Sequence, residues 1–287
     1  MSMIINTNVS SLNAQRNTAL TSSSLSTTMQ RLSSGLRINS AKDDAAGLAI
    51  ADRMNTQIRG MNVAVRNAGD AISMAQVAEG GLSAMNDMLT RMRDIAVQAS
   101  NAPNSTGASG DIQKLSNEYS QLSKELTRMM SATQFNGESI LRTTNDYTFQ
   151  VGANAGSENQ ITIGSADISL EGVAAFSGVA ETGANSALNT TNASGNIAVI
   201  SALDNALSAV NGRRATLGAV QSRFENTISY LRTAVENQSS ARSRIMDADF
   251  AQETANLSRT QILQQAGTAM IAQANQLPQN VLRLLQG

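Results

Sequence analysis

Apolar residues recur every seven positions between residues 58 and 99, as in a helix that buries one face against partner helices. A companion apolar row runs beside the first, slips by one residue near Glu79 and then resumes. Gly80 and Gly81 stand at the slip, and because glycine weakens a helix interior we expect a weak point or a break there. The first row is Met61, Ala68, Ala75, Leu82, Leu89 and Ala96, and the second is Ile58, Val65, Ile72, Met85, Met92 and Ala99.

Two more segments have helical spacing. Apolar residues between 112 and 129 step by three and four, and Asp111 stands where a first-turn carboxylate favours a helix. From 200 to 245 an apolar row with a seven-residue period continues for longer than an ordinary globular helix. A helix of that length needs partner helices, so we predict one long-helix, coiled-coil-like bundle. The rows are Ile112, Leu115, Tyr119, Leu122, Leu126 and Met129, and Leu203, Val210, Leu217, Phe224, Leu231 and Ile245.

The two ends of the chain carry weaker versions of the same pattern. Residues 249–252 resemble a capping box that would start the C-terminal helix, and residues 40–43 would start the helix after 43 in the same way. We therefore predict a separate helix at each end, within 1–42 and 254–287, paired with each other as a separate core domain. The apolar positions are Leu25, Met29, Leu32 and Leu36, in steps of four and three, and Leu263, Met270, Leu277 and Leu284, in steps of seven.

The ends also share a composition that the middle lacks. Residues 1–42 hold four basic side chains and no carboxylate, and residues 254–287 hold Arg259 and Arg283 and no carboxylate. Polar segments with so few charges suit burial in a packed assembly, because buried charges are costly. We therefore assign the terminal apolar rows to contacts between subunits, and expect the ends to be disordered in the free monomer and to fold on assembly.

The pattern changes between 135 and 195. Residues 148–151 and 160–163 alternate between apolar and polar positions around a Gly- and Asn-containing stretch, which predicts a β-hairpin at about 147–163. Residues 166–196 are rich in Gly, Ala, Ser, Thr and Asn, and we predict a loop-rich surface connector with at most one short strand. The predicted fold is therefore mainly α, with a bundle of 43–165 and 197–253 and a small β-hairpin region.

The composition supports this fold class and bears on partners. Aromatic residues are 3% of the chain against 41% apolar residues, and two prolines leave long helices unbroken. The net charge of −1 gives no case for binding nucleic acid. No stretch reaches the roughly 18 apolar residues of a membrane helix. Residues 1–6 lack the basic start and apolar run of a secretory signal. We expect no membrane insertion and no cleaved signal peptide.

The residue inventory excludes most catalytic chemistry. The 287-residue chain has no Cys and no His, so it can form no disulfide, no thiol nucleophile, no His/Cys zinc site and no Ser-His-Asp triad. The carboxylate pairs Asp43-Asp44 and Asp247/Asp249 lack the cleft of a glycosidase and the oxygen-rich loop of a calcium site, and we assign them to helix caps. We predict a protein that is not an enzyme and that takes no cofactor or metal.

Two classes of function fit these features. The first is a self-assembling structural protein, in which helices from many copies pack together. The second is a soluble coiled-coil adaptor or chaperone that binds partner helices. The adaptor predicts a finite oligomer with folded ends, whereas the structural protein predicts a long polymer.

Several blocks of the sequence resemble bacterial flagellin. They are residues 3–16, 32–48, 134–137, 248–251 and 276–285, so the resemblance covers about 1–165 and 197–287. In that family both termini form the inner core domain, the adjoining helices form the next shell, and a variable middle decorates the outside. The resemblance therefore implies a short type with little or no variable outer domain, and makes 166–196 a short variable surface connector. The closing Leu-Pro-Gln-Asn-Val-Leu motif separates the chain from the family's hook–filament junction relative.

The resemblance implies a structural subunit of the extracellular flagellar filament, which serves motility. Such a subunit is exported unfolded through the flagellar type III channel without signal cleavage. It polymerises with its own kind by terminal helix packing beneath a cap protein, next to hook-junction proteins. The resemblance also implies an export chaperone that binds within residues 247–287.

Two segments resemble stretches that host sensors read in flagellins. Residues 90–98 resemble the stretch read by the vertebrate surface receptor, with Arg91 and Ile95 in that stretch and Glu118 on the next helix as its acidic partner. Residues 90–98 are also explained as packing surface within a filament, and both interpretations can hold. The tail at 281–285 is also explained as a core helix, which is its primary role. The tail that resembles the target of cytosolic inflammasome sensors contains Val281, Leu282, Leu284 and Leu285.

Overall fold

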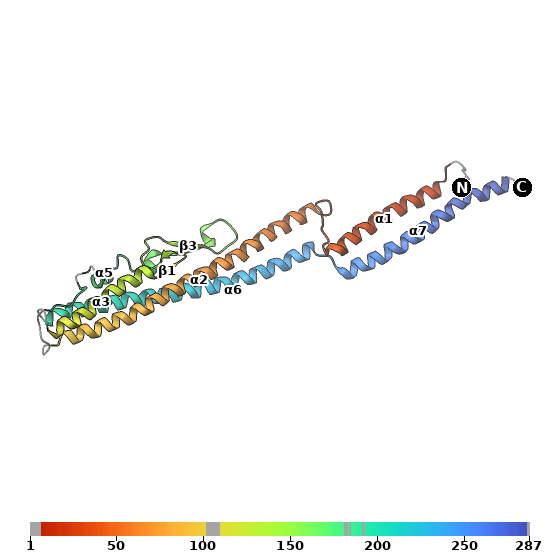
Figure 1. The fold of residues 1–287 in the computed structure, drawn as a ribbon. Coiled ribbons are helices and arrows are strands. Elements are labelled where there is room, and N and C mark those ends of the chain that lie inside the picture. The colour runs from red at the N-terminus through yellow and green to blue at the C-terminus, as the bar shows by residue number, and fades with distance from the viewer. Residues whose placement is uncertain (1–6, 102–109, 181–182, 184, 191–192, 286–287) are drawn as a thin grey trace. The chain divides into compact units, whose positions relative to one another are not determined.

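A computed structural model describes residues 7–101, 110–180, 183, 185–190 and 193–285. It confirms the predicted mainly α fold with a small β region (Figure 1). The long helices are α1 (Val9–Ser34), α2 (Ala45–Ala99), α3 (Asp111–Ala132), α6 (Ile197–Met246) and α7 (Phe250–Leu285). The short elements are β1 (Gln134–Phe135), β2 (Glu138–Ser139), β3 (Tyr147–Gln150), η1 (Ser157–Asn159), β4 (Gln160–Ile163), α4 (Ser165–Ile168), α5 (Ala174–Val179) and η2 (Ala193–Asn196).

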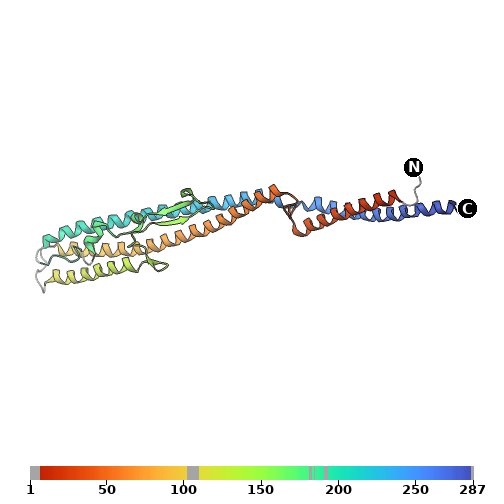
Figure 2. The same cartoon turned by 90° about the horizontal axis from the view of Figure 1, so that it is seen from above.

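The chain forms two compact units, whose boundaries fall inside α2 and α6. The first unit comprises residues 1–56 and 236–287, and the second comprises residues 57–235. In the first unit α1 and α7 lie side by side, which confirms that the terminal helices pair (Figures 1 and 2). None of the helices in the part of the chain that the structure describes contains an apolar stretch of the length that spanning a membrane requires.

The second unit holds the main hydrophobic core, formed by α2, α3 and α6 with the β region packed on them (Figure 2). The seven-residue rows predict this core well, because the side chains of both α2 rows from residue 82 onward are fully buried. On α3 the buried Tyr119 hydroxyl donates to the Asn185 carbonyl oxygen at 2.9 Å, and burial raises the pKa of Tyr119. Fully buried members of the rows are Leu82, Met85, Leu89, Met92, Ala96, Ala99, Ile112, Tyr119, Leu126, Leu203, Val210, Leu217 and Phe224.

The predicted break at Gly80 and Gly81 is wrong, because α2 runs through both glycines without interruption. A Cβ on Gly81 would lie 2.7 Å from Thr133 Oγ1, whereas a Cβ on Gly80 would meet nothing within 4 Å. Gly81 therefore permits the close approach of the chain that follows α3. At the slip in the apolar rows, α2 makes a polar contact with α6: Gln221 Nε2 donates to Glu79 Oε2 at 3.0 Å.

Gly80→Ala and Gly81→Ala are expected to change stability in opposite directions. Alanine at 80 enters open space and should raise the free energy of unfolding by about 1 kcal/mol, the difference in helix propensity. Alanine at 81 must displace Thr133 and should lower the free energy of unfolding by about 1–3 kcal/mol, as overpacking does. Urea unfolding followed by helical circular dichroism measures both. Equal stabilisation by the two substitutions would contradict the packing described for Gly81.

The predicted hairpin is confirmed, and a second, shorter one accompanies it. Strands β3 and β4 pair antiparallel with Thr148 opposite Thr162, and Phe149 meets Phe224 of α6 edge to face at 5.8 Å between ring centres. Strands β1 and β2 form the second hairpin. Its turn is Asn136-Gly137, with φ of 52° and 85°, the backbone that this dipeptide favours.

The predicted surface connector at 166–196 has more structure than its composition indicates. Its described residues hold most of α4, together with α5 and η2, and no strand, so the short strand considered for this segment is not found there. The segment also contributes to the core of the second unit. Its buried apolar side chains are Ile168, Leu170, Phe176, Val179 and Leu188.

Two of the four carboxylates assigned to helix caps do cap helices, whereas Asp43 accepts from Ser40 and Asn39 in a turn and Asp247 accepts from Ser243 Oγ. Asp249 Oδ1 accepts from the backbone N–H of Ala251 and Gln252 at 2.9 and 3.2 Å, so it caps α7 as predicted. The start predicted at residues 40–43 is wrong, because α2 begins at Ala45 and its cap is Asp44, whose Oδ1 accepts from Gly47 N–H at 2.8 Å.

Candidate functional site

The surface between α1 and α7 is made mainly of small and polar side chains. The positions that face inward follow a three-four spacing, as in an antiparallel coiled coil. Among them only Leu25 and Leu32 on α1, and Leu257 and Ile271 on α7, are large and apolar. The inward set, here called the seam, is Ser11, Ala14, Thr18, Thr21, Leu25, Thr28 and Leu32 of α1 with Glu253, Leu257, Thr260, Gln264, Gly267, Ile271 and Ala274 of α7.

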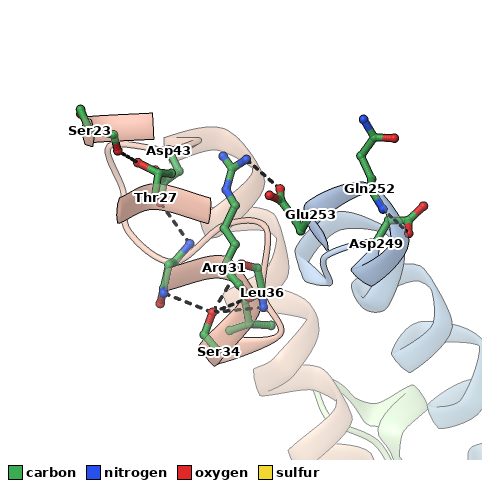
Figure 3. A network of polar contacts seen from close by, with 10 residues as sticks. Ser23, Thr27, Arg31, Ser34, Leu36, Asp43, Asp249, Gln252 and Glu253 are labelled. Atoms are coloured by element: carbon green, nitrogen blue, oxygen red, sulfur yellow. Dashed lines mark hydrogen bonds and ion pairs between the residues drawn. The ribbon is translucent and has the colours of Figure 1, made fainter. Parts of the chain in front are cut away.

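Polar contacts pin both ends of the seam. At one end Asn8 Nδ2 donates to the Ala274 carbonyl oxygen at 2.7 Å and Ser11 Oγ donates to Asn275 Oδ1 at 2.8 Å. At the other end Arg31 Nη1 donates to Glu253 Oε1 at 3.3 Å, as Figure 3 shows. These contacts fix α1 and α7 as antiparallel neighbours.

Large apolar side chains lie on the outside of the α1–α7 pair. Met29 is 56% exposed, and Leu263 and Met270 are 50% and 63% exposed. An isolated helix pair would bury such residues, so their exposure is unusual, even though exposed Ser and Thr, such as Ser23 and Thr27, lie beside them. The outward apolar set, here called the outer stripes, is Val9, Leu12, Leu20 and Met29 of α1 with Ile262, Leu263 and Met270 of α7. Several exposed large apolar side chains on one helix pair are compatible with a protein–protein interface.

A shallow groove of about 260 Å³ opens between the two helices near one end of the stripes. It is lined by Met29, Leu32, Ser33, Leu257 and Gln261, so apolar side chains of both helices reach its floor. The groove therefore adds a concave apolar element to the outer stripes.

The structure separates the terminal residues that the sequence grouped together. Leu25 and Leu32 are half-buried in the seam, whereas Met29, Leu263 and Met270 belong to the outer stripes. Leu36 packs in a small cluster elsewhere in the first unit, with Ile38, Ala51 and Met246. The side chains of Leu277 and Leu284 lie outside the described residues, as do those of Val281, Leu282 and Leu285.

In the first unit, backbone hydrogen bonds join the segment after α1 to the segment between α6 and α7. The sequence did not reveal this junction. Gly35 takes a left-handed conformation, with φ of 71°, and its carbonyl oxygen accepts from Ala248 N–H at 2.9 Å. Arg37 N–H donates to the Met246 carbonyl oxygen at 2.6 Å, and its guanidinium donates to the Ile245 carbonyl oxygen at 2.7 Å. The segment after α1 is therefore paired with the segment between α6 and α7.

The turn between the junction and α2 is held by Asp43 (Figure 3). Its Oδ2 accepts from the backbone N–H of Ser40 at 2.9 Å and of Asn39 at 3.2 Å. These hydrogen bonds, with a smaller contribution from the Arg31 charge, hold the pKa of Asp43 below its ordinary value.

The three residues predicted as a receptor surface do not all lie on the surface. Arg91 of α2 forms an exposed ion pair with Glu118 of α3, with 2.7 Å between Arg91 Nη2 and Glu118 Oε1. Ile95 is only 1% exposed and packs in the core, so its assignment to a surface is wrong. The reason is its place on α2, where it follows Met92 and precedes Ala96 and Ala99 on the face that α3 and α6 cover.

No catalytic or metal-binding constellation stands out among the residues that the structure describes. There, no group of three or more Asp and Glu side chains is placed to hold a metal ion. The surface best suited to binding a partner is therefore the outer face of the α1–α7 pair, which can bind apolar helix faces.

Comparisons with known proteins identify the family. The sequence model of the bacterial flagellin N-terminal helical region matches residues 5–146, and that of the bacterial flagellin C-terminal helical region matches residues 200–285. The flagellin of Halalkalibacterium halodurans is 45% identical over 285 residues, which cover 99% of this chain and 100% of that relative. The chain belongs to the bacterial flagellin family. Only residues 147–199 separate the two matched regions, so this is a flagellin-family chain of the short type, without a large variable domain.

Other flagellin relatives also align along the whole chain. The flagellar filament 33 kDa core protein of Treponema phagedenis is 42% identical over 295 residues, and the flagellin of Bacillus subtilis is 38% identical over 305 residues. Each alignment covers 99% of this chain and 100% of the relative. The crystal structure of Bacillus cereus flagellin is 27% identical, with a TM-score of 0.47, over 58% of this chain and 88% of that one.

Proposed function

We propose that this chain is the structural subunit of the extracellular flagellar filament and that it polymerises through its terminal helices to serve motility. One observation carries the mechanism: the α1–α7 pair leaves the seven large apolar side chains of the outer stripes exposed, while small and polar residues make up most of its seam. A helix pair built in this way is poorly stabilised alone, because its apolar surface stays in water. Packing the outer stripes against other copies removes that surface from water, so assembly supplies the stability that the single pair lacks.

The polymer gains its strength from repetition. Burying a Leu or Met side chain contributes about 1.5–3 kcal/mol. Each subunit offers seven apolar side chains in the outer stripes, and every copy in a filament offers the same set. The positions that we assign to polymerisation are Leu25, Met29, Leu32, Leu36, Leu263, Met270, Leu277 and Leu284, to which the structure adds Val9, Leu12, Leu20 and Ile262.

The same proposal divides the chain by role. Residues 1–42 with 254–287 form the inner filament core, residues 43–165 with 197–253 form the next shell, and residues 166–196 form a surface connector. The protein acts by assembly and has no enzymatic turnover. Its other partners are a flagellar export chaperone, which binds within 247–287, and the cap and hook-junction proteins.

Host recognition of the free subunit is a second proposed property. The exposed Arg91–Glu118 pair offers a receptor one charged patch that spans α2 and α3, and the tail at 281–285 offers cytosolic sensors an apolar segment. Arg91→Ala should weaken receptor activation in a reporter-cell assay about tenfold, the size of an interface contact worth more than 1 kcal/mol. Arg128→Ala, in the exposed pair with Glu125, is the matched control. Equal responses to both variants would remove Arg91 from the recognised surface.

Negative-stain electron microscopy of purified protein with short filament seeds tests the filament function. The full chain should grow long filaments, and a chain that lacks residues 1–35 and 254–287 should stay monomeric because it lacks both outer stripes. A small, defined oligomer of the full chain, even with seeds, would favour the adaptor alternative instead.

A further inference from the structure

The Arg31–Glu253 contact is the one ion pair in the seam among the described residues, and it is unusually buried. The Glu253 side chain is 9% exposed and the Arg31 side chain 32% exposed, whereas the partners in the other ion pairs described are 41% exposed or more. A buried ion pair is a poor source of stability, because both charges lose their water. The Arg31–Glu253 pair therefore has a role other than stabilising the helix pair.

The pair is also incompletely satisfied. A single hydrogen bond of 3.3 Å joins Arg31 Nη1 to Glu253 Oε1, while Arg31 Nε and Glu253 Oε2 are buried without a hydrogen-bond partner. Apolar side chains at both positions would avoid this penalty, as replacements of buried ion pairs show in other proteins. The pair is favourably placed in one respect: Glu253 lies in the first turn of α7 and Arg31 in the last turn of α1, where the helix dipoles favour their charges.

Between the polar contacts of Asn8 and Ser11 at one end and the junction after α1 at the other, the rest of the seam specifies register weakly. Gly267 lies close to Thr18, since a Cβ built on Gly267 would sit 2.7 Å from Thr18 Oγ1, and most other seam positions are also small or polar. Because the seam repeats every seven residues, a slip of seven keeps inward positions opposite inward positions. Such a slip of one helix along the other would separate Arg31 from Glu253 and leave the buried Glu253 carboxylate without its partner.

We propose that the Arg31–Glu253 pair fixes the register of α1 against α7, at a cost in stability, so that the outer stripes of the two helices align for assembly. Single buried polar residues specify register in coiled coils in this way. This proposal rests on the filament function. The register of α1 against α7 matters because the outer stripes of one subunit must pack against other copies. Arg31 and Glu253 are positioning residues that act through the two helices.

Cross-linking can read the register directly, because the chain has no cysteine. Thr18 Cβ lies 3.7 Å from a Cβ built on Gly267, within the roughly 3.5–4.5 Å that a disulfide requires. Thr18→Cys/Gly267→Cys therefore reports the observed register. Thr18→Cys/Thr260→Cys and Thr18→Cys/Ala274→Cys report slips of seven residues in either direction. The full chain carries each pair, is elongated from filament seeds and is then oxidised, and the intramolecular cross-link is measured by gel shift and peptide mapping.

In the parent background the native reporter should form its cross-link about tenfold more than either slipped reporter, the discrimination expected of a buried polar pair. With Arg31→Met/Glu253→Leu the lead should fall below about threefold, and growth from seeds should slow, while the thermal midpoint stays equal or rises. Arg31→Lys/Glu253→Asp keeps both charges and should keep the lead. A retained tenfold lead in the apolar variant would overturn the proposal.

A charge exchange guards against misfolding of the apolar variant. Arg31→Glu alone should abolish the native lead, and Arg31→Glu/Glu253→Arg should regain part of it, although the exchanged charges oppose the helix dipoles. Equal loss in the single and the exchanged variant would overturn the proposal. If the parent chain grows no filaments, the filament function fails. If the parent grows filaments and the apolar variant keeps the tenfold lead, the register proposal alone fails.

Discussion

The double variant Leu263→Glu/Met270→Glu is expected to raise the protein concentration needed for filament growth about a thousandfold or more. Both side chains are exposed in the single subunit and lie in the outer stripe of α7. Their burial between copies contributes about 1.5–3 kcal/mol each, and a loss of about 4 kcal/mol corresponds to a factor of about a thousand in an equilibrium constant. Two carboxylates buried without partners would weaken assembly further.

Light scattering after addition of seeds measures this concentration. Leu263→Met/Met270→Leu is the matched control, because it keeps apolar side chains of similar volume at the same two positions. It should grow filaments at nearly the parental concentration. The circular dichroism spectrum of the full chain should be the same in all three proteins, since neither residue contributes to the core of the second unit. Parental growth by the double Glu variant would show that the α7 stripe faces solvent in the filament.

Phe224→Ala should lower the free energy of unfolding of the helical bundle by about 3–5 kcal/mol. Phe224 of α6 is fully buried in the core, and its ring meets that of Phe149 of β3 at an interplanar angle of 84°. The substitution leaves a cavity and also removes the edge-to-face contact that holds the β3–β4 hairpin on α6. Because a domain is stabilised by about 5–15 kcal/mol in total, the loss takes away a large part of that stability.

Urea unfolding followed by helical circular dichroism measures the change. Tyr230→Ala is the control on the same helix, since Tyr230 is 71% exposed and its loss should alter the free energy of unfolding by no more than about 0.5 kcal/mol. An equal effect of the two substitutions would contradict the placement of the core.

The helices and the main core follow directly from the sequence because their signals are local and repeated. The seven-residue rows on α2 and α6 extend over many turns, so one irregular position cannot hide the period. The prediction of a break at Gly80 and Gly81 was wrong because the apolar rows continue on both sides of the glycines. Their contacts with the core hold α2 together. The short hairpin at 134–139 had a usable signal in Asn136-Gly137, which the prediction did not exploit.

The assembly surface was harder to predict, because a period of seven does not say which partner covers the row. The Leu263 and Met270 row has the spacing of a helix core, yet the seam of the subunit uses the neighbouring row that contains Gly267 and Ile271. The difference reflects the close approach of Thr18 to Gly267, which a row of large side chains would prevent. The junction between Gly35 and Ala248 joins residues far apart in the sequence through backbone hydrogen bonds, and these leave no local pattern.

Methionine oxidation in the filament tests most directly whether the outer stripes are buried between copies. Met29 and Met270 lie on the two stripes and are exposed in the single chain, while Met85 and Met92 are buried in the core of the second unit and serve as internal controls. After brief exposure to hydrogen peroxide, mass spectrometry should find Met29 and Met270 oxidised in monomers and protected in filaments, with Met85 and Met92 protected in both. Equal oxidation of Met29 and Met270 in monomers and filaments would contradict burial of the stripes.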